Sequence, residues 1–302
     1  MDPPRFVIEA PEAASMAKDA GLALTDLLPT LVGDAKCLAR TPISRYHVGA
    51  VGLGSSGRIF FGVNLEFTGL PLHHSVHAEQ FLATNLALHC EPRLLSVAVS
   101  STPCGHCRQF FQEIRHAPEI QIRVFPVNDP DQEPDPAFGP LSRLLPRRFG
   151  PSDLLGEEVP LLLEPHHNGL TLSTRNPTHE SSCNGFCGGP EADELAAAAL
   201  EAANESHAPY SKCPSGVAIV DREGKVYKGS YAESAAYNPS LGPVQAALVA
   251  YVARGGGGYE GIVGGVLVEK EGAVVRQEHT ARLLMGLVSP KCEFRVVHCR
   301  SG

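Results

Sequence analysis

The chain has 302 residues, of which 43% are hydrophobic and 19% are charged, and its formal net charge is −8. These values are typical of a globular protein long enough for two domains, and they argue against a disordered chain. The acidic balance argues against binding nucleic acid through a broad basic surface. No apolar run reaches the roughly 20 residues that a membrane helix needs, so we expect no membrane association.

The cysteine content and the N-terminal segment indicate the compartment. The segment MDPPRFVIEAPEAAS lacks a basic region followed by an apolar core, so we expect no secretory signal. Nine cysteines are an odd number, and without a secretory signal they are typical of reduced cytosolic thiols. The sequence therefore predicts a cytoplasmic protein without a disulfide framework.

The first predicted module covers residues 1–128 and alternates helix and strand. Its apolar pattern predicts a helix over roughly 13–33, and a glycine-bounded hairpin begins near Pro42. A second helix is expected over about 77–89, followed by the strand LLSVAVSS and a helix that opens at Pro103. This order predicts an α/β fold with a mixed sheet flanked by helices.

A predicted linker, residues 129–190, follows the first module. Eleven of the 25 prolines lie between positions 126 and 190, together with the Gly- and Ser-rich segment SSCNGFCGG. Such a composition predicts little regular structure. A second module is then expected over residues 191–302, beginning with a helix over 191–205.

The second module repeats the pattern of the first. The segment PISRYHVGAV…GRIFFGVNLEF can be laid without gaps over PYSKCPSGVA…GKVYKGSYAES. Identical residues then coincide at six positions: Pro42, Ser44, Gly49, Gly57, Gly62 and Glu66 fall on Pro209, Ser211, Gly216, Gly224, Gly229 and Glu233. Two unrelated hairpins could share so sparse an identity, but the glycines lie where strand turns need them.

One constant shift predicts different chemistry in the two modules. It places Val244 opposite His77, Ala246 opposite Glu79, Glu271 opposite Cys104 and Val274 opposite Cys107. Every candidate reactive group of the first module is absent from these positions. We therefore expect a catalytic first module, a non-catalytic second one, and one metal ion per chain.

The motifs HAE and PCGHC carry the predicted chemistry. Their candidate metal ligands are His77, Cys104 and Cys107, and two thiolates with one imidazole form a ligand set that suits tetrahedral zinc. Three protein ligands leave the fourth position for water, as in catalytic zinc sites. Glu79 is then available as the base that takes a proton from that water.

Other interpretations of these motifs remain open. A C-x-x-C pair also occurs in redox proteins, and a structural zinc site would need a fourth ligand, for which His106, His73 or His74 could serve. Cys183 and Cys187, with His179, could form a second metal site, although a pair of linker thiols is the simpler interpretation.

SVHAEQ and TPCGHCRQF together resemble the zinc-dependent cytidine deaminases. PISRYHVGA, GVNLEFTG, AFGP and GSYAESAAYNP resemble the long, homodimeric bacterial and plant type, in which a working module precedes a degenerate copy. The resemblance is strong over about residues 40–125 and 190–255. It implies two copies of an α/β/α layered fold, a zinc cofactor and a homodimer.

The resemblance also implies roles for individual residues. Glu79 would move protons between water, ring N3 and the leaving amine, and Asn64 and Glu66 would hold the ribose 3′-hydroxyl. Tyr46, where the family often has phenylalanine, would stack on the pyrimidine. The Ala78 N–H and the Thr102 carbonyl would contact the pyrimidine edge. Residues of the partner subunit would close the site: Ala235, Ala236 and Tyr237.

The expected function is therefore hydrolytic deamination of cytidine and 2′-deoxycytidine in pyrimidine salvage, with a small-molecule nucleoside as substrate. A nucleic-acid cytosine deaminase would use the same chemistry, but it would need a basic groove for the strand. A zinc-stabilised scaffold without catalytic activity is the third possibility, and metal chelation would distinguish it because a scaffold should unfold.

Overall fold

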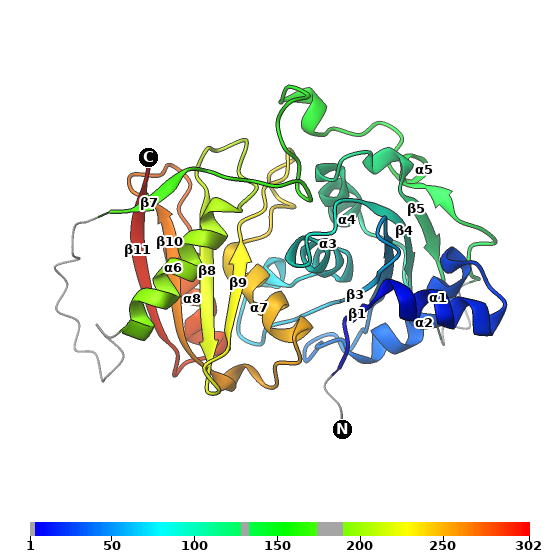
Figure 1. Cartoon of the computed structure of the whole chain (residues 1–302), viewed down its shortest axis with the longest axis horizontal. Helices are drawn as coiled ribbons and strands as arrows, with labels where there is room; N and C mark the ends of the chain where they lie inside the picture. The colour runs from blue at the N-terminus through cyan, green and yellow to red at the C-terminus, as the bar shows by residue number, and fades with distance from the viewer. Residues whose placement is uncertain (1–3, 128–132, 174–189) are drawn as a thin grey trace. The chain divides into compact units, whose positions relative to one another are not determined.

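The computed structural model describes residues 4–127, 133–173 and 190–302 (Figure 1). The chain divides into two compact units. The first contains the chain up to Glu164 together with Ser234–Ser240 and Ala253–Gly255, and the second contains the remainder. No helix among the described residues combines the length and the apolar character needed to cross a membrane.

The first unit is built on a six-stranded sheet in the order β1-β3-β2-β4-β5-β6. Only β4 and β5 are parallel, and the other neighbours are antiparallel. The connection between β4 and β5 carries the helix that holds both candidate thiolates. The strands are β1 (Val7–Ile8), β2 (Gly49–Gly54), β3 (Ile59–Val63), β4 (Leu94–Val99), β5 (Gln121–Val124) and β6 (Gly139–Pro140).

Helices cover both faces of this sheet. Two glycines on opposite faces allow their close approach, since a Cβ at Gly49 would lie 2.5 Å from the Lys36 backbone of α2, and one at Gly62 would lie 2.2 Å from the Ala78 backbone of α3. The unit therefore has the expected three layers (Figure 1). Its helical segments are α1 (Ala10–Ala20), α2 (Leu24–Cys37), η1 (Leu72–His74), α3 (Ala78–Leu88), α4 (Gly105–Phe110), η2 (Phe111–Glu113), η3 (Ala117–Glu119), α5 (Leu141–Leu144) and η4 (Pro151–Asp153).

The single N-terminal helix predicted over roughly 13–33 is wrong. Two helices, α1 and α2, occupy this segment, and Gly21 ends the first in the left-handed conformation with φ 67°. The N–H of Gly21 and the N–H of Leu22 then bond to carbonyls of the last turn of α1. The helical periodicity of the sequence continues through this break, which is why the pattern alone did not reveal it.

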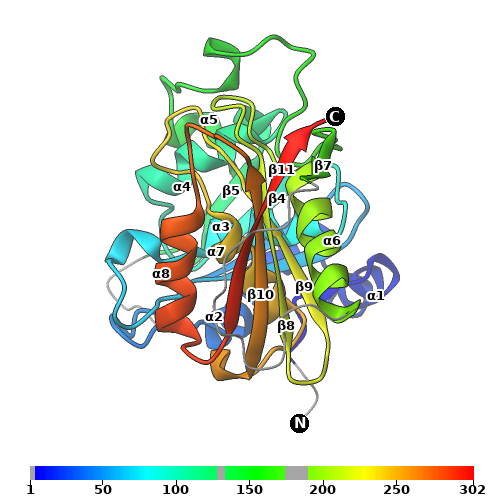
Figure 2. The same ribbon diagram turned by 90° about the vertical axis from the view of Figure 1, so that its left-hand side faces the viewer.

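The second unit has a five-stranded sheet in the order β7-β11-β10-β8-β9, with β10 and β11 parallel. Figure 2 shows α6 on one face of this sheet and α8 on the other. The elements are β7 (Leu170–Leu172), α6 (Pro190–Asn204), β8 (Ser215–Asp221), β9 (Val226–Ser230), α7 (Pro243–Ala253), η5 (Tyr259–Gly261), β10 (Ile262–Lys270), α8 (Glu278–Val288) and β11 (Glu293–Ser301).

The internal repeat is visible as matching structure in the two units. Gly216 packs against α6 as Gly49 packs against α2, with Cβ positions that would meet the equivalent backbone atoms. Arg45 and Lys212, which coincide in the repeat, both have φ 57°, an uncommon conformation for residues other than glycine. Such agreement in backbone detail excludes a chance likeness of two hairpins.

Beyond Glu66 and Glu233 the two modules no longer align at one constant shift. The four predicted counterparts of His77, Glu79, Cys104 and Cys107 are therefore wrong. The isolated bridge from Leu65 to Val76 corresponds to one from Ala232 to Leu241, so the second loop is two residues shorter. Because α3 begins at Ala78 and α7 at Pro243, the counterpart of His77 is Gly242, not Val244, and that of Glu79 is Val244, not Ala246.

The predicted counterparts of Cys104 and Cys107 in the second module are also wrong. The registers of β4 and β10 against their neighbours shift the alignment again, so Glu271 and Val274 do not stand opposite Cys104 and Cys107. The conclusion about chemistry is unaffected, because the chain has no cysteine between Cys213 and Cys292. The second module has neither the histidine nor the paired thiols of the first.

The described part of the predicted linker packs with the two units. β6, α5 and η4 belong to the first unit, where Arg115 and Glu164 form an ion pair with an N–O distance of 2.7 Å. β7 belongs to the second unit, where it pairs with β11. The division between the units falls at Glu164 and Pro165, inside the segment predicted as 129–190.

Candidate metal centre

His77 is held at the entrance of α3. Its backbone is extended, with φ −80° and ψ 155°, and it is the N-cap residue of the helix. The His77 N–H donates to the Gln80 side-chain oxygen at 3.3 Å, which satisfies a backbone group that the helix leaves unpaired. In this arrangement His77 and Glu79 can serve one site, because only Glu79 is helical.

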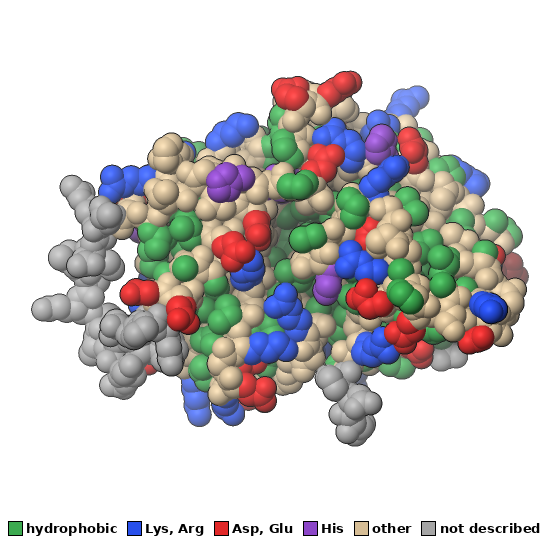
Figure 3. Space-filling view, viewed as in Figure 1, with side chains coloured by type: hydrophobic (Ala, Val, Ile, Leu, Met, Phe, Trp, Pro, Cys, Tyr) green, Lys and Arg blue, Asp and Glu red, His purple; other side chains and the backbone are tan. Residues whose placement is uncertain are grey.

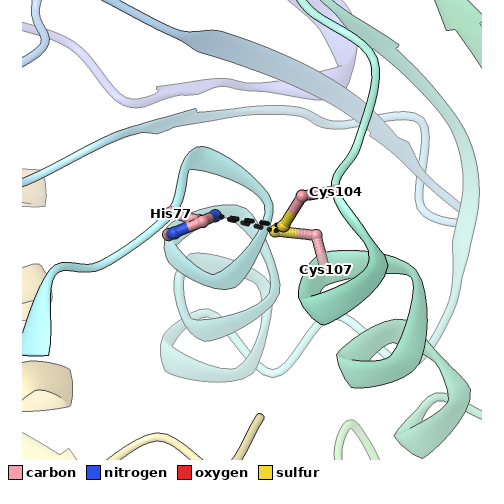
Figure 4. A group of neighbouring side chains, drawn as sticks. All are labelled: His77, Cys104 and Cys107. Atoms are coloured by element: carbon pink, nitrogen blue, oxygen red, sulfur yellow. Dashed lines mark hydrogen bonds between the residues drawn. The ribbon is translucent and has the colours of Figure 1, made fainter. Parts of the chain in front are cut away.

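Cys104 and Cys107 lie at the start of α4. Cys104 is the N-cap residue, with φ −69° and ψ 169°, and Cys107 is buried in the following turn. The helix thus begins at Gly105, two residues after the expected opening at Pro103. Figure 4 shows both sulfur atoms directed at the ring of His77.

The distances among the three donor atoms match a tetrahedral metal site. The two Sγ atoms are 3.7 Å apart, and the His77 Nδ1 lies 3.5 Å from Cys104 Sγ and 3.3 Å from Cys107 Sγ. With Zn–S near 2.3 Å and Zn–N near 2.0 Å, tetrahedral angles place two sulfurs about 3.8 Å apart and sulfur and nitrogen about 3.5 Å apart. These residues therefore fit zinc without rearrangement.

The electrostatics of the donors favour a cation between them. Hydrogen bonds from Cys107 and His77 lower the pKa of Cys104 to about 3, so this sulfur is a thiolate. The hydrogen bond that Cys107 donates to Cys104, together with burial, raises the pKa of Cys107, so the proton between the two sulfurs stays on Cys107. A divalent cation would replace this shared proton, and both sulfurs could then bind as thiolates.

Glu79 lies beside the donors but outside their group. It is 4% exposed, and its Oε2 is 3.3 Å from Cys107 Sγ. The donors that all lie within 4.8 Å of one another are His77, Cys104 and Cys107. Burial raises the pKa of Glu79, which suits a carboxyl group that gains and loses a proton.

The histidines considered as a fourth ligand are engaged elsewhere. His106 stacks on His77 with ring centroids 5.5 Å apart, and its Nε2 lies 3.4 Å from Gln80 Nε2. His73 and His74 stack on each other in η1. None of the three belongs to the donor group found among the described residues. The geometry thus favours a site with an open position over a closed structural one.

The predicted ribose-binding residues organise the loop before β2. Glu66 Oε2 accepts the N–H groups of Ile43 and Ser44, each at 2.9 Å, and its other oxygen accepts the Ser44 hydroxyl. Asn64 accepts the Val48 N–H at 2.8 Å and donates to the Tyr46 carbonyl at 2.9 Å. Both side chains therefore hold the segment that carries Tyr46.

The remaining predicted contact residues are spread over three segments. Tyr46 is 53% exposed, and its hydroxyl lies 2.7 Å from Ser101 Oγ, so the departure from phenylalanine has an intramolecular partner. Ala78 is buried in the first turn of α3, and Thr102 is exposed just before α4. Ala235 is buried, whereas Ala236 and Tyr237 are exposed, in a loop that belongs to the first compact unit.

Two further groups of possible ligands bear on the metal count. Glu269, Glu278 and His298 lie within reach of one ion in the second unit, a cluster that the sequence pattern did not reveal. The buried Glu269, however, accepts the Gln277 N–H at 2.7 Å and so caps α8. The predicted linker group lies outside the described residues: His179, Cys183 and Cys187.

Sequence reasoning also missed two buried polar residues that contact the segment Ser234–Ser240, Gln80 and Glu113. Gln80 could have been found, because a glutamine three residues after an N-cap is a helix-start pattern. Glu113 has no such signal, since its partner, the Ala235 N–H, lies 122 positions away along the chain.

Comparison with known families gives two matches in this chain. Residues 27–123 and residues 141–282 each match a model described as the cytidine and deoxycytidylate deaminase zinc-binding region. The first segment contains all three metal donors and Glu79. The sequence of the second segment contains no C-x-x-C pair.

Curated relatives extend over nearly the whole chain. Cytidine deaminase 1 of Arabidopsis thaliana is 61% identical over 304 residues, covering 99% of both chains. Cytidine deaminase 6 of the same plant is 50% identical and covers 98% of both, and probable inactive cytidine deaminase 4 is 43% identical and covers 98% of this chain and 96% of its own length. A crystal structure of cytidine deaminase from Mycobacterium tuberculosis is 29% identical, covers 41% of this chain and 96% of that chain, and has a TM-score of 0.35.

Proposed function

The chain belongs to the cytidine and deoxycytidylate deaminase family, and we propose that it deaminates cytidine and 2′-deoxycytidine by hydrolysis. The products are uridine or 2′-deoxyuridine and ammonia, so one water is consumed for each amine released. The observation that carries this proposal is the triad of His77, Cys104 and Cys107 at zinc-ligand spacing, with the buried Glu79 beside it. Since relatives include a protein described as probably inactive, the presence of all four groups here is essential to the argument.

Glu79 is the proposed proton carrier. His77, Cys104 and Cys107 would hold zinc, which would supply a Lewis acid that makes water a stronger nucleophile. The Glu79 carboxylate takes a proton from the attacking water, delivers it to ring N3, and passes the second proton to the leaving amine. Its burial supports this role, because burial raises the pKa of Glu79 and so favours a carboxyl group that can hold a proton.

The nucleoside would be positioned by residues from three segments of the chain. Asn64 and Glu66 would bind the ribose 3′-hydroxyl, and Tyr46 would stack on the pyrimidine. The Ala78 N–H and the Thr102 carbonyl would contact the edge of the ring. Their support is local: Asn64 and Glu66 hold the segment that carries Tyr46, and Ala78 and Thr102 adjoin the metal donors in the chain.

A single nucleoside is a better candidate than a nucleic-acid strand. On the face drawn in Figure 3, Lys and Arg side chains are interspersed with Asp and Glu among the residues shown in colour. The net charge of −8 points the same way, because strand binders neutralise many phosphates with basic side chains. A labelled single-stranded oligonucleotide offered at low salt should not bind.

We further propose that the protein acts as a cytosolic homodimer in pyrimidine salvage. In this arrangement Ala235, Ala236 and Tyr237 of one subunit close the nucleoside site of its partner. The exposure of Tyr237, 69%, supports the proposal because a side chain that caps a neighbouring site must project from its own subunit. Sedimentation should give the mass of two chains, and Tyr237→Ala should raise KM for cytidine.

Ultraviolet detection of cytidine conversion tests the main proposal directly. The wild-type protein should convert cytidine to uridine, and chelation should stop the reaction before the fold is lost. Circular dichroism on the same chelated sample distinguishes the scaffold alternative, which predicts unfolding as zinc is removed. A wild-type preparation with one zinc per chain and no turnover of either nucleoside would refute the proposed function.

A further inference from the structure

The loop Ser234–Ser240 follows β9 in the chain, yet it belongs to the first compact unit. It is closed by its own hydrogen bonds: the Ser234 N–H donates to Ser240 Oγ at 3.0 Å, and the Tyr237 N–H donates to the Ser234 carbonyl at 2.8 Å. These hydrogen bonds give the loop a defined shape, so a few contacts with the rest of the chain are enough to fix its position.

Glu113 makes the first of these contacts, with Ala235. Its carboxylate is 0% exposed and accepts the Ala235 N–H at 2.7 Å, in a buried hydrogen bond with a charged acceptor. Glu113 ends η2, which follows α4 without a break, so it is rigidly connected to the helix that carries Cys107. Ala235 is thereby tied to the element that presents the thiolates.

Gln80 makes the second contact, with Pro239. It is 1% exposed, and its Nε2 donates to the Pro239 carbonyl at 3.0 Å. Its Oε1 accepts the His77 N–H at 3.3 Å. One side-chain amide therefore joins the loop to the backbone of the histidine donor, and any displacement of one partner disturbs the other.

Tyr237 lies between the two anchored points in a strained conformation. Its φ is 61°, which an aromatic residue rarely adopts, and its side chain is 69% exposed. Such a conformation persists where neighbouring contacts over-determine it. The contacts of Glu113 with Ala235 and of Gln80 with Pro239 flank Tyr237 on both sides and supply that constraint.

We propose that Glu113 and Gln80 are positioning residues that fix the loop Ser234–Ser240 and so set the direction in which Tyr237 projects toward the nucleoside site of the partner subunit. The second module then contributes to catalysis through this loop, although it has no metal donors of its own. The expected change in KM rests on the proposed function. The anchoring of the loop by Glu113 and Gln80 does not, because hydrogen–deuterium exchange measures it separately.

Glu113→Ala in the full chain tests the first anchor. We expect KM for cytidine to rise about tenfold, the value for losing one buried charge-assisted hydrogen bond, with kcat and zinc content nearly unchanged. Hydrogen–deuterium exchange of the peptide containing Ala235 should become faster. Glu113→Gln should restore most of both properties, because an amide oxygen still accepts the Ala235 N–H.

Gln80→Ala and Gln245→Ala form a matched pair for the second anchor. Gln245 occupies the same third position of α7 that Gln80 occupies in α3. Gln80→Ala should raise KM and loosen the loop, whereas Gln245→Ala should leave KM at the wild-type value. Equal effects of the two substitutions would show that only general helix stability had changed, and would overturn the role of Gln80.

Two outcomes of Glu113→Ala overturn the proposal. One is a folded variant with wild-type KM and wild-type exchange, and the other is a variant that loses zinc while exchange of the Ala235 peptide stays at the wild-type rate. If Glu113→Ala does not fold, Ser240→Ala loosens the loop from within and should accelerate the same exchange and raise KM; no change in either contradicts the proposal. If the wild type does not act on cytidine, hydrogen–deuterium exchange still shows whether Glu113 anchors the loop. Failure of the proposed function and failure of this inference can therefore be told apart.

Discussion

Glu66 and Glu233 make the same hydrogen bonds in the two modules, although only the first module has metal donors. Glu66 accepts the Ile43 and Ser44 N–H groups at 2.9 Å, and Glu233 accepts the Tyr210 and Ser211 N–H groups at 2.8 and 3.1 Å. Each also accepts a serine hydroxyl, from Ser44 or Ser211. This network is therefore part of the repeated fold, and any ribose contact by Glu66 is an addition to it.

Glu66→Gln and Glu233→Gln separate these two roles. Each substitution should lower the free energy of unfolding by about 1–3 kcal/mol, because a neutral amide is a weaker acceptor for the same donors. Only Glu66→Gln should also raise KM for cytidine beyond what the stability loss explains. Urea denaturation and steady-state kinetics measure the two effects. Equal KM values for the two variants would leave Glu66 with the structural role alone.

Glu79→Gln should abolish turnover and retain zinc. The amide keeps the size of the side chain but cannot carry a proton, so we expect kcat to fall by a factor of about 100 or more. Metal analysis of the purified variant gives the control, since Glu79 lies outside the donor group. Loss of zinc from a folded Glu79→Gln protein would show that Glu79 is a ligand.

The protein should bind one zinc per chain. The counterparts of His77 and Glu79 in the second module are Gly242 and Val244, and the Glu269 carboxylate of the other candidate cluster caps α8. Cys104→Ser should therefore remove essentially all bound zinc, whereas His298→Ala should remove none. A second tightly bound ion in the wild type would contradict this, and its retention in Cys104→Ser would place it outside the first module.

Glu91 should make stability depend on acid pH. Its side chain is 0% exposed and pairs with Arg58 at 2.9 Å, while Ser55 Oγ and the Ser56 N–H donate to it at 3.0 Å. Burial alone would raise the pKa of Glu91, but the hydrogen bonds from Ser56, Ser55 and Arg58 outweigh burial and lower it. Because the pKa is lower in the folded state, this stabilisation is present at neutral pH and is lost as pH falls through the folded value.

Glu91→Gln should therefore cost about 3 kcal/mol of unfolding free energy at pH 7, because it leaves Arg58 without its buried partner. The difference from wild type should shrink as the pH falls through the lowered pKa of Glu91 in the folded protein. Glu12→Gln is the matched control, since the Arg5–Glu12 pair is exposed and its loss should change the free energy of unfolding little at any pH. A constant difference between Glu91→Gln and wild type at all pH values would contradict the assigned cause.

The metal donors are determined by local sequence. His77 precedes a helix, and Cys104 and Cys107 stand one turn apart at the start of the next, so short-range spacing and helix-start geometry place each side chain. A sheet flanked by helices was likewise predictable, because the alternation of apolar helices and glycine-bounded strands follows from periodicities within each element. The similarity of the two modules was visible in the sequence because both contain the glycines that allow strand and helix backbones to pack closely.

Contacts between distant segments were decided only by the tertiary structure. Gly21 separates α1 from α2 within one continuous apolar pattern, and the shorter loop before α7 moved the counterpart of His77 to Gly242. The anchoring of Ala235 by Glu113 joins residues 122 positions apart. A buried carboxylate needs a donor of suitable geometry, and which backbone N–H supplies it depends on how the whole chain packs, not on the residues beside it.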